Sequence, residues 1–388
     1  MRDAVIVDAV RTPVGKRKGS LSKAHSVSLS AHVLKALAER TGLDPALVDD
    51  VIWGCTGTVG MQTGNVGRMA VLAAGWPESV PGVTLDRQCG SSQQAVHFAA
   101  QGVISGAYDV AVAGGVEIMS RIPLGSTRGD GTFGEPHGPD VWDRYDGVRF
   151  SQGMGAHMIA EEYGITRTEM DQHALDSHAR AARAIDEGRF KGQIAPVTVT
   201  DEDGTERVFD TDEGVRRGGT LETLAGLKPA FKEDGTITAG NASQISDGAG
   251  ALLVTTSEFA KSQGWTPLAR VHTAVLAGTD PVTMLKGPIP ATRKALKKAG
   301  LTVDDIGAFE INEAFASVSL AWLRELGADY ERMNPNGGAM ALGHPIGGSG
   351  ARIMATLVHH MRDNNIRYGL QSMCEGGGMA NATILELL

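Results

Sequence analysis

Apolar residues recur at helical spacing in two widely separated segments of the chain. The first segment, residues 29–40, ends at Gly42, which can adopt the left-handed conformation of a helix C-cap. An acidic turn and the short apolar strand 51–53 follow it. The second segment, residues 289–298, ends at Gly300, passes another acidic turn and enters the strand 308–311. Both segments therefore predict the same order of helix, glycine cap, acidic turn and strand.

The spacing of glycines indicates that this order arose by duplication. Gly42 and Gly300 lie 258 residues apart, and so do Gly90 and Gly348. Small-residue helical patterns follow at 93–105 and 351–361, and apolar strands at 110–113 and 370–373. Helices that alternate with short strands predict two similar α/β halves, with mainly parallel sheets covered by helices. Coincidence among 51 glycines is the alternative explanation.

The region between the two halves has a different pattern. Residues 125–136 are rich in glycine and polar residues, and residues 198–214 carry repeated acidic side chains, so both are predicted to be loops. One clear helical pattern spans residues 167–187. We therefore predict an inserted subdomain, a natural place for a lid over a substrate.

The composition narrows the class of protein. The 388 residues are 42% hydrophobic and 21% charged, as in a globular protein of two or three domains. A formal charge of −9 argues against binding to nucleic acid or to a membrane surface. No segment has the length of a transmembrane helix, and the N-terminus lacks the apolar region of a signal peptide. Three cysteines without CxxC spacing predict neither a disulfide framework nor a zinc site, so we expect a cytoplasmic protein.

Two of the cysteines lie at the ends of predicted strands, next to glycine. Cys89 precedes a predicted helix, whose positive end favours a thiolate and whose free N–H groups can bind an oxyanion. A small buried thiol is the alternative at this position. Cys374 precedes three glycines, whose N–H groups could form a second oxyanion site. We expect both sulfur atoms to be accessible to a substrate.

A histidine occurs in the glycine-rich segment 336–352. Its glycines predict a turn without a core around it, so we expect His344 not to be buried, with Pro345 stiffening the backbone behind it. A neutral imidazole could deprotonate a thiol near pH 7. Asn312, at the end of a strand in the same half, offers an amide that could hold a water molecule. The sequence thus supplies a nucleophile, a base and a second thiol.

These residues form a set of motifs that extends over the whole chain. The set comprises DAVRTP at 8–13, GNAS at 240–243, SDGA at 246–249, NEAF at 312–315, GHP at 343–345 and CEGGG at 374–378. In this order and context the motifs resemble the thiolase superfamily, specifically the degradative 3-ketoacyl-CoA thiolases and the acetyl-CoA acetyltransferases.

The resemblance implies a ping-pong mechanism and a role for each reactive residue. Cys89, activated by His344, would attack the keto carbonyl of a 3-ketoacyl-CoA, form an acyl-enzyme and release an acetyl-CoA enolate that Cys374 protonates. A second coenzyme A would then take the acyl group. His344 and a water held by Asn312 would stabilise the enolate, and the N–H groups of Cys89 and Gly376 would stabilise the tetrahedral adduct.

The resemblance also implies coenzyme A as a co-substrate, with no permanently bound cofactor and no metal. By motif match, Ser243 would contact the pantetheine, and Arg216 and Thr223 would lie near the adenine. Arg216, Arg217 and Lys228 would supply a basic patch, for which solvated surface is the alternative. The other residues expected to contact the ligand or line its channel are Met154, Phe231, Ala239, Met284, Ala314 and Phe315.

The fold implied by the resemblance is α/β, with two duplicated halves in a layered αβαβα arrangement and an inserted loop subdomain. The expected boundaries are 1–117 with 247–268 for the first half, 118–246 for the insertion, and 269–388 for the second half. Thiolases pair as dimers, and some form tetramers, so a homodimer or homotetramer is implied. Partners are otherwise acyl-CoA and coenzyme A, without nucleic acid or membrane.

Some positions depart from the commonest family pattern and bear on the substrate. Gly153 stands where many short-chain enzymes have histidine, Ser92 replaces a glycine, and Glu375 replaces an apolar residue. Gln93 and Gln94 replace a usual apolar and basic pair, and these two residues together with the CEGGG motif look like thiolases of bacterial lipid or steroid breakdown, more than biosynthetic acetoacetyl-CoA thiolases, which are the alternative.

Three other functions are open at this stage. A ketosynthase of the same fold would need a second histidine where Asn312 stands. A noncatalytic protein that binds coenzyme A or lipid is expected to have lost one of the reactive groups, all of which are present here. A reversible disulfide between Cys89 and Cys374 could regulate the enzyme, because both thiols would converge on one site.

Overall fold

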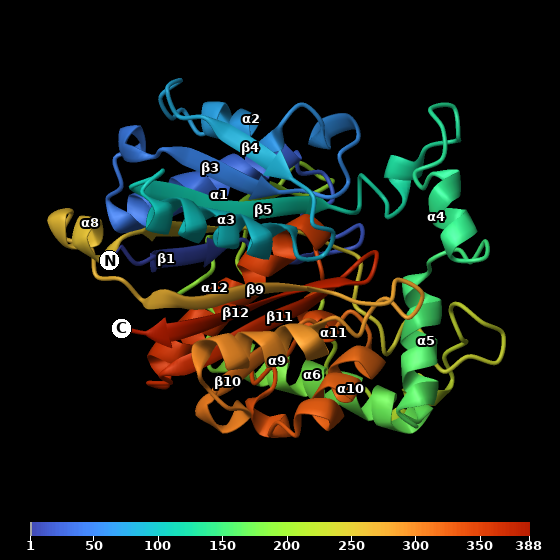
Figure 1. Ribbon diagram of the computed structural model, residues 1–388. Coiled ribbons are helices and arrows are strands. Elements are labelled where there is room, and N and C mark those ends of the chain that lie inside the picture. Colours follow the sequence, from blue (N-terminus) through green and yellow to red (C-terminus); the bar gives the residue numbers. More distant parts are fainter. Residues whose placement is uncertain (1) are drawn as a thin grey trace.

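The computed structural model describes residues 2–388 and contains two α/β halves around one central sheet. Figure 1 shows the strands of the two halves side by side, with α8 at one side of the molecule and α4 standing out from the opposite side. The elements of the first half are β1 (Val5–Arg11), β2 (Gly15–Lys16), α1 (Ser26–Thr41), β3 (Asp50–Gly54), α2 (Val66–Ala73), β4 (Gly82–Leu85), α3 (Ser91–Ser105), β5 (Val110–Ile118), β8 (Ser246–Thr255) and α8 (Ser257–Ser262).

The region between β5 and β8 contains more regular structure than its sequence predicts. The expected helix is α6 (Arg167–Asp186), which begins with a capping box between Thr166 and Glu169. The loop predicted at 198–214 is wrong in part, because β6 (Val197–Thr200) and β7 (Glu206–Phe209) form there. The sequence predicted no elements at α4 (Pro139–Arg144), α5 (Gln152–Glu162) and α7 (Leu221–Ala225), since each is short and carries little apolar periodicity.

The second half repeats the helix and strand order of the first. Both predicted glycine caps are present: Gly42 ends α1 at φ 67° and Gly300 ends the corresponding helix at φ 69°, values that favour glycine. The elements are β9 (Ala269–Gly278), α9 (Pro288–Ala299), β10 (Ala308–Ile311), α10 (Ala316–Leu326), α11 (Ala339–Leu342), α12 (Ile346–Asp363), β11 (Tyr368–Glu375) and β12 (Met379–Leu387).

Strand pairing confirms the duplication. In the first half β3 pairs parallel with β5, β5 antiparallel with β8, and β8 antiparallel with β1. In the second half β10 pairs parallel with β11, β11 antiparallel with β12, and β12 antiparallel with β9. The two halves join where Val5 and Ile6 of β1 pair with Arg270 and Ala269 of β9.

The prediction of mainly parallel sheets is wrong. Within residues 2–388 the parallel pairs are β3–β4, β3–β5 and β10–β11, and the other pairs are antiparallel. A glycine turn joins β11 directly to β12, and neighbouring strands connected in this way must run antiparallel, because a parallel connection needs a long crossover.

Alternating strand residues divide the core into layers. Val51 and Trp53 of β3 pack in one cluster with α1 and α2, whereas Ile52 between them packs in a second cluster with α3 and α12. In the second half, Ala382 and Ile384 of β12 pack with α9 and α10 in a further cluster. The helices α3 and α12 therefore lie between the two halves of the sheet, which is the expected αβαβα order.

Candidate active site

Cys89 lies in a tight turn directly before α3. The turn is held by Ser91, whose Oγ accepts the Arg87 N–H (2.9 Å) and donates to the Gln88 carbonyl (2.6 Å). Gln88 adopts φ 49°, the left-handed region, and its N–H donates to Asp86 Oδ1 (2.6 Å). This strained turn fixes the direction of the Cys89 side chain at the helix N-terminus.

The environment of Cys89 differs from the one its sequence predicts. Only 3% of the residue is exposed, so the expected accessible sulfur is wrong for the free protein. Burial, and then the neighbouring Glu375, raise the pKa of the Cys89 thiol to about 12, whereas the Gln152 amide and the N–H groups of Cys89 and Gly376 lower it. The helix N-terminus therefore does not hold a thiolate by itself, and a base must remove the proton.

Cys374 lies close enough to Cys89 for the charge of one to affect the other. It is the penultimate residue of β11 and is fully buried. Burial raises the pKa of the Cys374 thiol well above the usual value, and the charge of Cys89 is the second largest cause of this rise. Like Cys89 it is buried rather than accessible, contrary to expectation. The structure thus brings Cys89, Cys374 and the Gly376 N–H together, although they come from opposite halves of the chain.

His344 is buried as well, which corrects the expectation from its glycines. The residue is 5% exposed. The glycines around it let backbones approach closely instead of opening the turn to solvent: a Cβ on Gly343, at φ 95°, would lie 2.3 Å from Ser246 Oγ. Burial, and then Arg352, lower the pKa of His344 to about 3, so the imidazole is neutral near pH 7.

Hydrogen bonds define the tautomer of His344. Ser349 Oγ donates its single proton to the Pro345 carbonyl (2.9 Å) and lies 2.6 Å from His344 Nδ1. Nδ1 must therefore carry the hydrogen and donate it to Ser349. The Nε2 atom is left with a lone pair and has no hydrogen-bond partner within residues 2–388. It is available to accept a proton.

Asn312 follows the last residue of β10 and offers another unsatisfied group. Its side chain is 2% exposed, and neither amide atom has a hydrogen-bond partner among the residues described. A buried amide of this kind needs a partner from outside the chain, such as water or a substrate.

The residues expected to bind coenzyme A divide into an inner and an outer group. Met284, Ala314 and Phe315 pack in one cluster with Cys374, and the Phe231 ring lies 5.9 Å from that of Phe315. The outer residues are at the surface or near it: Arg216, Thr223 and Ala239 are exposed, Met154 is 36% exposed, and Ser243 is half-buried, with its N–H donating to the Ala314 carbonyl (2.9 Å).

Three residues near the site carry no role in the sequence prediction. Gln152, from α5 of the inserted region, reaches the Cys89 thiol. Ser349 binds His344. Glu117 accepts hydrogen bonds from the N–H groups of Thr56 (3.0 Å) and Gly347 (2.9 Å), so it ties the loop after β3 to the start of α12. Ser349 lies in the glycine-rich segment 336–352, whereas Gln152 lies in none of the named motifs, and the contacts of both depend on the fold.

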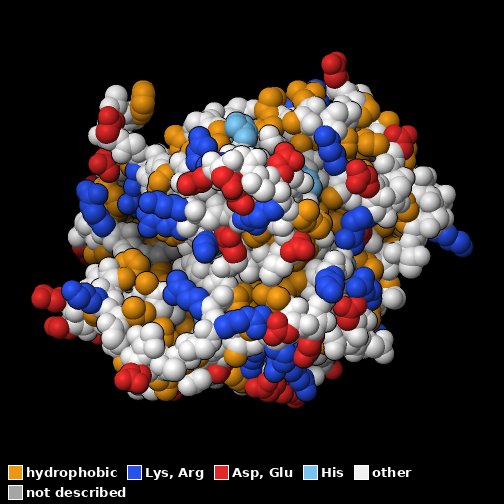
Figure 2. Space-filling model, turned by 180° about the vertical axis from the view of Figure 1, so that it is seen from behind, with side chains coloured by type: hydrophobic (Ala, Val, Ile, Leu, Met, Phe, Trp, Pro, Cys, Tyr) orange, Lys and Arg blue, Asp and Glu red, His pale blue; other side chains and the backbone are white. Residues whose placement is uncertain are grey.

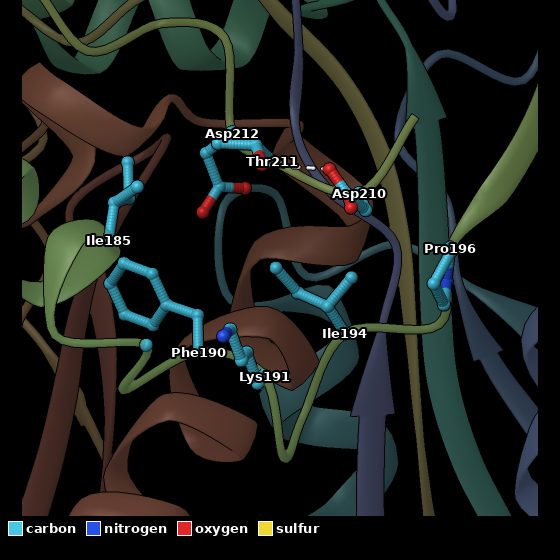
Figure 3. Close-up of a pocket in the computed structure, with 9 residues that line it drawn as sticks. Ile185, Phe190, Lys191, Ile194, Pro196, Asp210, Thr211 and Asp212 are labelled. Atoms are coloured by element: carbon cyan, nitrogen blue, oxygen red, sulfur yellow. Dashed lines mark hydrogen bonds between the residues drawn. The ribbon is translucent and has the colours of Figure 1, made fainter. Parts of the chain in front are cut away.

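A separate cavity of about 240 Å³ lies away from these residues. Figure 3 shows Ile185, Phe190 and Ile194 on its walls together with the Asp212 carboxylate. That carboxylate is already paired with Arg11, through bonds of 2.7 and 2.8 Å, and accepts the Val14 N–H (2.8 Å). The cavity therefore holds a satisfied buried ion pair and none of the predicted site residues.

The described part of the chain has no cluster of three or more metal-ligating side chains. Among residues 2–388 no helix is both long and apolar enough to cross a membrane.

Comparison with known proteins agrees with this fold. Residues 4–258 match the family "Thiolase, N-terminal domain", and residues 265–387 match "Thiolase, C-terminal domain". The chain therefore belongs to the thiolase family. The predicted family, fold and acyltransferase class are confirmed.

Individual relatives cover the whole chain. It is 51% identical to the steroid 3-ketoacyl-CoA thiolase FadA6 of Mycobacterium tuberculosis, over 100% of this chain and 95% of the relative. The crystal structure of a Bacillus anthracis acetyl-CoA acetyltransferase superposes with a TM-score of 0.92 at 42% identity, covering 100% of this chain and 99% of that one. Human mitochondrial 3-ketoacyl-CoA thiolase gives 0.92 at 38% identity with the same coverage.

Proposed function

We propose that this protein catalyses the reversible, coenzyme A-dependent cleavage of a 3-ketoacyl-CoA into acetyl-CoA and a shortened acyl-CoA. The proposal rests on one observation: two thiols from opposite halves of the chain, Cys89 and Cys374, are close enough for the charge of Cys89 to raise the pKa of Cys374, and the N–H of Gly376 lies beside Cys89. One thiol can form a covalent acyl-enzyme while the other exchanges a proton with the acetyl unit. The opposite direction, biosynthesis of acetoacetyl-CoA, uses the same groups.

The first half of the reaction begins with proton transfer. His344 Nε2 takes the proton of the Cys89 thiol, and the thiolate attacks the 3-keto carbon. The tetrahedral oxyanion then accepts hydrogen bonds from the N–H groups of Cys89 and Gly376. When the carbon–carbon bond breaks, the electron pair passes to the acetyl-CoA enolate, which Cys374 protonates at carbon.

The second half of the reaction transfers the acyl group. The Cys374 thiolate takes the proton of an incoming coenzyme A thiol, and that sulfur attacks the thioester at Cys89. The bond from the acyl carbon to the Cys89 sulfur breaks, and the departing thiolate takes back the proton from His344 Nε2. His344 Nε2 and a water held by the Asn312 amide stabilise the enolate in the first half-reaction. Both groups are buried and unpaired within the described chain, which supports this role.

Coenzyme A is proposed to approach from the side that carries α4 and α5. Figure 2 shows a hollow on that side with Lys and Arg side chains gathered around it. Positive charge there suits the phosphates of an anionic ligand, which a chain of net charge −9 would otherwise repel. Arg216 is exposed, and no ion pair involving it is formed among the described residues, so it remains a proposed adenine-end contact. Residues 118–246 would act as the lid.

The covalent intermediate can be tested by mass spectrometry. After incubation with acetyl-CoA, the wild-type protein should gain one acetyl group, located at Cys89 by peptide mapping. Cys89→Ala should lose both the adduct and turnover. Cys55→Ala is the matched control, since Cys55 is another fully buried thiol and has no role in the proposed reaction. An adduct that persists in Cys89→Ala would contradict the proposal, and unaltered function would favour a noncatalytic binding protein.

A bulky acyl group is the second part of the proposal. The relative of 51% identity is named a steroid thiolase, and the Phe231 ring occupies the place a side chain at Gly153 would take, with a virtual Cβ only 2.2 Å away. Phe231 is half exposed, so it can move aside to admit a large acyl group. Kinetics with acetoacetyl-CoA and with a ring-containing 3-ketoacyl-CoA would decide the point. A strong preference for acetoacetyl-CoA would favour the biosynthetic alternative.

We also propose a cytoplasmic homodimer or homotetramer. The strand β4 pairs with β3 alone within the described residues, so one edge is free, and Figure 1 shows β4 at the end of the sheet. Val83 on this strand is 42% exposed, and Met69 and Leu72 of the adjacent α2 are similarly exposed. An apolar free edge of this kind favours pairing with a second copy. Light scattering on the purified protein would report the mass, and a monomer would contradict the proposal.

A further inference from the structure

Four glutamates are buried in the folded chain, and they differ in how well their charge is satisfied. Glu117 accepts hydrogen bonds from Thr56, Gly57, Gln62 and Gly347. Glu313 is bonded to Ser177, Asn334 and Met340. Glu375 is fully buried, yet neither of its carboxyl oxygens has a partner within residues 2–388. A buried carboxyl without partners is costly when ionised and therefore requires a reason.

Glu375 lies directly against the turn that carries the nucleophile. A Cβ built on Gly90, the N-cap of α3, would lie 2.0 Å from Glu375 Oε1 and 2.7 Å from Asn381 Nδ2. Asn381 donates to the Gly90 carbonyl (3.0 Å), which holds this contact in place. In strand β11 residues 374 and 375 point to opposite faces. Cys374 thus packs with the inner substrate residues, whereas Glu375 lies behind the turn.

Glu375 and Cys89 both lie at the N-terminus of α3, so their negative charges would compete for stabilisation by the positive end of this helix. The free N–H groups at the start of α3 stabilise one negative charge. Two anions at this end would repel each other in a site that excludes water, so ionisation of one opposes ionisation of the other.

We propose that Glu375 is a positioning residue that controls when Cys89 can become a thiolate, because its carboxyl group must keep its own proton while Cys89 gives up its proton. The inference rests on the proposed function only in taking Cys89 as the nucleophile. In the reactive state the Cys89 S–H bond breaks, the proton moves to His344 Nε2, and the Glu375 O–H bond stays intact. In the resting alkaline state Glu375 is the anion and Cys89 remains a thiol.

The groups around Glu375 support this division of charge. Burial raises the pKa of Glu375 to about 8, with Arg87 lowering it and Asp86 raising it from the loop before α3. From β12 the facing groups are the uncharged Asn381 and Met379, the latter 3.9 Å from Arg87 Nη1. The charge of Glu375 is in turn the second largest cause, after burial, of the raised pKa of Cys89. The carboxyl therefore carries its proton near pH 7 and loses it at alkaline pH.

Alkylation of Cys89 by iodoacetamide tests the inference without any turnover. Rates would be measured from pH 6 to pH 9.5 by peptide mass spectrometry at Cys89, for the wild type and for Glu375→Gln. Glutamine resembles the protonated acid, so the two profiles should coincide below about pH 7. Above pH 8 the variant should react about tenfold faster, the effect of one pKa unit on the thiolate population.

Two further variants test whether a change in the alkylation rate comes from the lost charge of Glu375 or from a general disturbance of the structure. Glu375→Met removes the ionisable group in a different way and should show the same separation at alkaline pH. Glu310→Gln is the matched control: Glu310 is also buried and burial raises its pKa to about 8, but it is not among the groups that shift the pKa of Cys89. It should leave the alkylation profile unchanged.

Parallel wild-type and Glu375→Gln profiles would overturn the inference, and so would an equal acceleration at every pH, which indicates a loosened turn. Thiolysis of a 3-ketoacyl-CoA, measured over the same pH range, separates this outcome from the proposed function. If the wild type shows no thiolysis while the alkylation profiles separate as expected, the proposed reaction fails and the coupling between Glu375 and Cys89 stands.

Discussion

A single hydroxyl group decides which nitrogen of His344 can act as a base. The Ser349 hydroxyl donates its proton to the Pro345 carbonyl, so it can only accept a hydrogen bond from His344 Nδ1. The lone pair of the imidazole is therefore on Nε2. Removing the hydroxyl would free the ring to rotate or to change tautomer, either of which points an N–H where the lone pair is needed. Ser349 thus acts on the reaction through the histidine.

Ser349→Ala should lower kcat about tenfold while KM stays nearly constant, because the base is misplaced but no substrate contact is lost. Steady-state thiolysis kinetics check this split. Ser319→Ala is the matched control, since Ser319 is also a buried serine bonded to a histidine, His173 (2.8 Å), away from the two thiols. A KM effect in Ser349→Ala, or an equal loss in the control, would contradict the assignment.

The sequence predicts which residues react, and that assignment stays a prediction, whereas the surroundings of these residues could not be predicted. The glycine contexts of Cys89, Cys374 and His344 indicate turns near strand ends, and the structure brings the two thiols together. The same glycines led to a wrong expectation of exposure, since a missing Cβ can open a turn or let another backbone pack against it. Which of the two occurs depends on partners from the other half of the chain, and so does the contact of Gln152 with Cys89.

At the scale of elements, the two central helices meet near their N-terminal ends. The Ala351 N–H of α12 donates to Ser92 Oγ of α3 (2.9 Å). A Cβ on Gly350 would lie 2.2 Å from the Gln93 backbone nitrogen, closer than any side chain tolerates. The turn of Cys89 precedes one helix and the turn of His344 precedes the other, so this contact sets the relative position of nucleophile and base.

Gly350→Ala should therefore reduce stability and activity together. The added methyl group must push α3 and α12 apart, at a cost of about 1–3 kcal/mol in the free energy of unfolding. Thermal unfolding and kcat measure the two effects. Gly138→Ala is the control, because Gly138 has φ −66° and open space around its Cα, so both quantities should stay close to wild type. Normal activity in Gly350→Ala would show that the helices do not hold the site.

In the two repeated segments the helices and strands followed from local sequence, whereas strand pairing did not. Gly42 and Gly300 end their helices as predicted, because a left-handed C-cap is a local property of the backbone. The antiparallel direction of β8, β9 and β12 depends on where the chain returns after each connection. The register of a strand is likewise fixed by neighbours far away in sequence, as when Val5 pairs with both Thr255 and Arg270.

For the molecule as a whole, buried titratable groups make stability depend on pH in two opposite directions. Burial lowers the pKa of His97 and His344 to about 3, against about 6.5 in an unfolded chain. Their contribution is present above pH 6.5 and is lost as the pH falls toward 3. Burial raises the pKa of Glu310 and Glu375 to about 8. Their contribution is present below about pH 4.5 and is lost as the pH rises toward 8.

Stability should therefore be highest between about pH 4.5 and 6.5 and fall on both sides of this range, and the loss on the acid side can be assigned to a residue. His97 bonds to Thr383 Oγ1 (2.7 Å) far inside the core, where a glutamine could keep that bond without binding a proton. Below pH 6.5 a buried histidine costs up to about 1.4 kcal/mol per pH unit. Melting temperatures from pH 4 to 7 should fall less steeply in His97→Gln than in wild type, whereas His137→Gln on the protruding segment should follow wild type. Identical slopes in all three proteins would show that acid lability arises elsewhere.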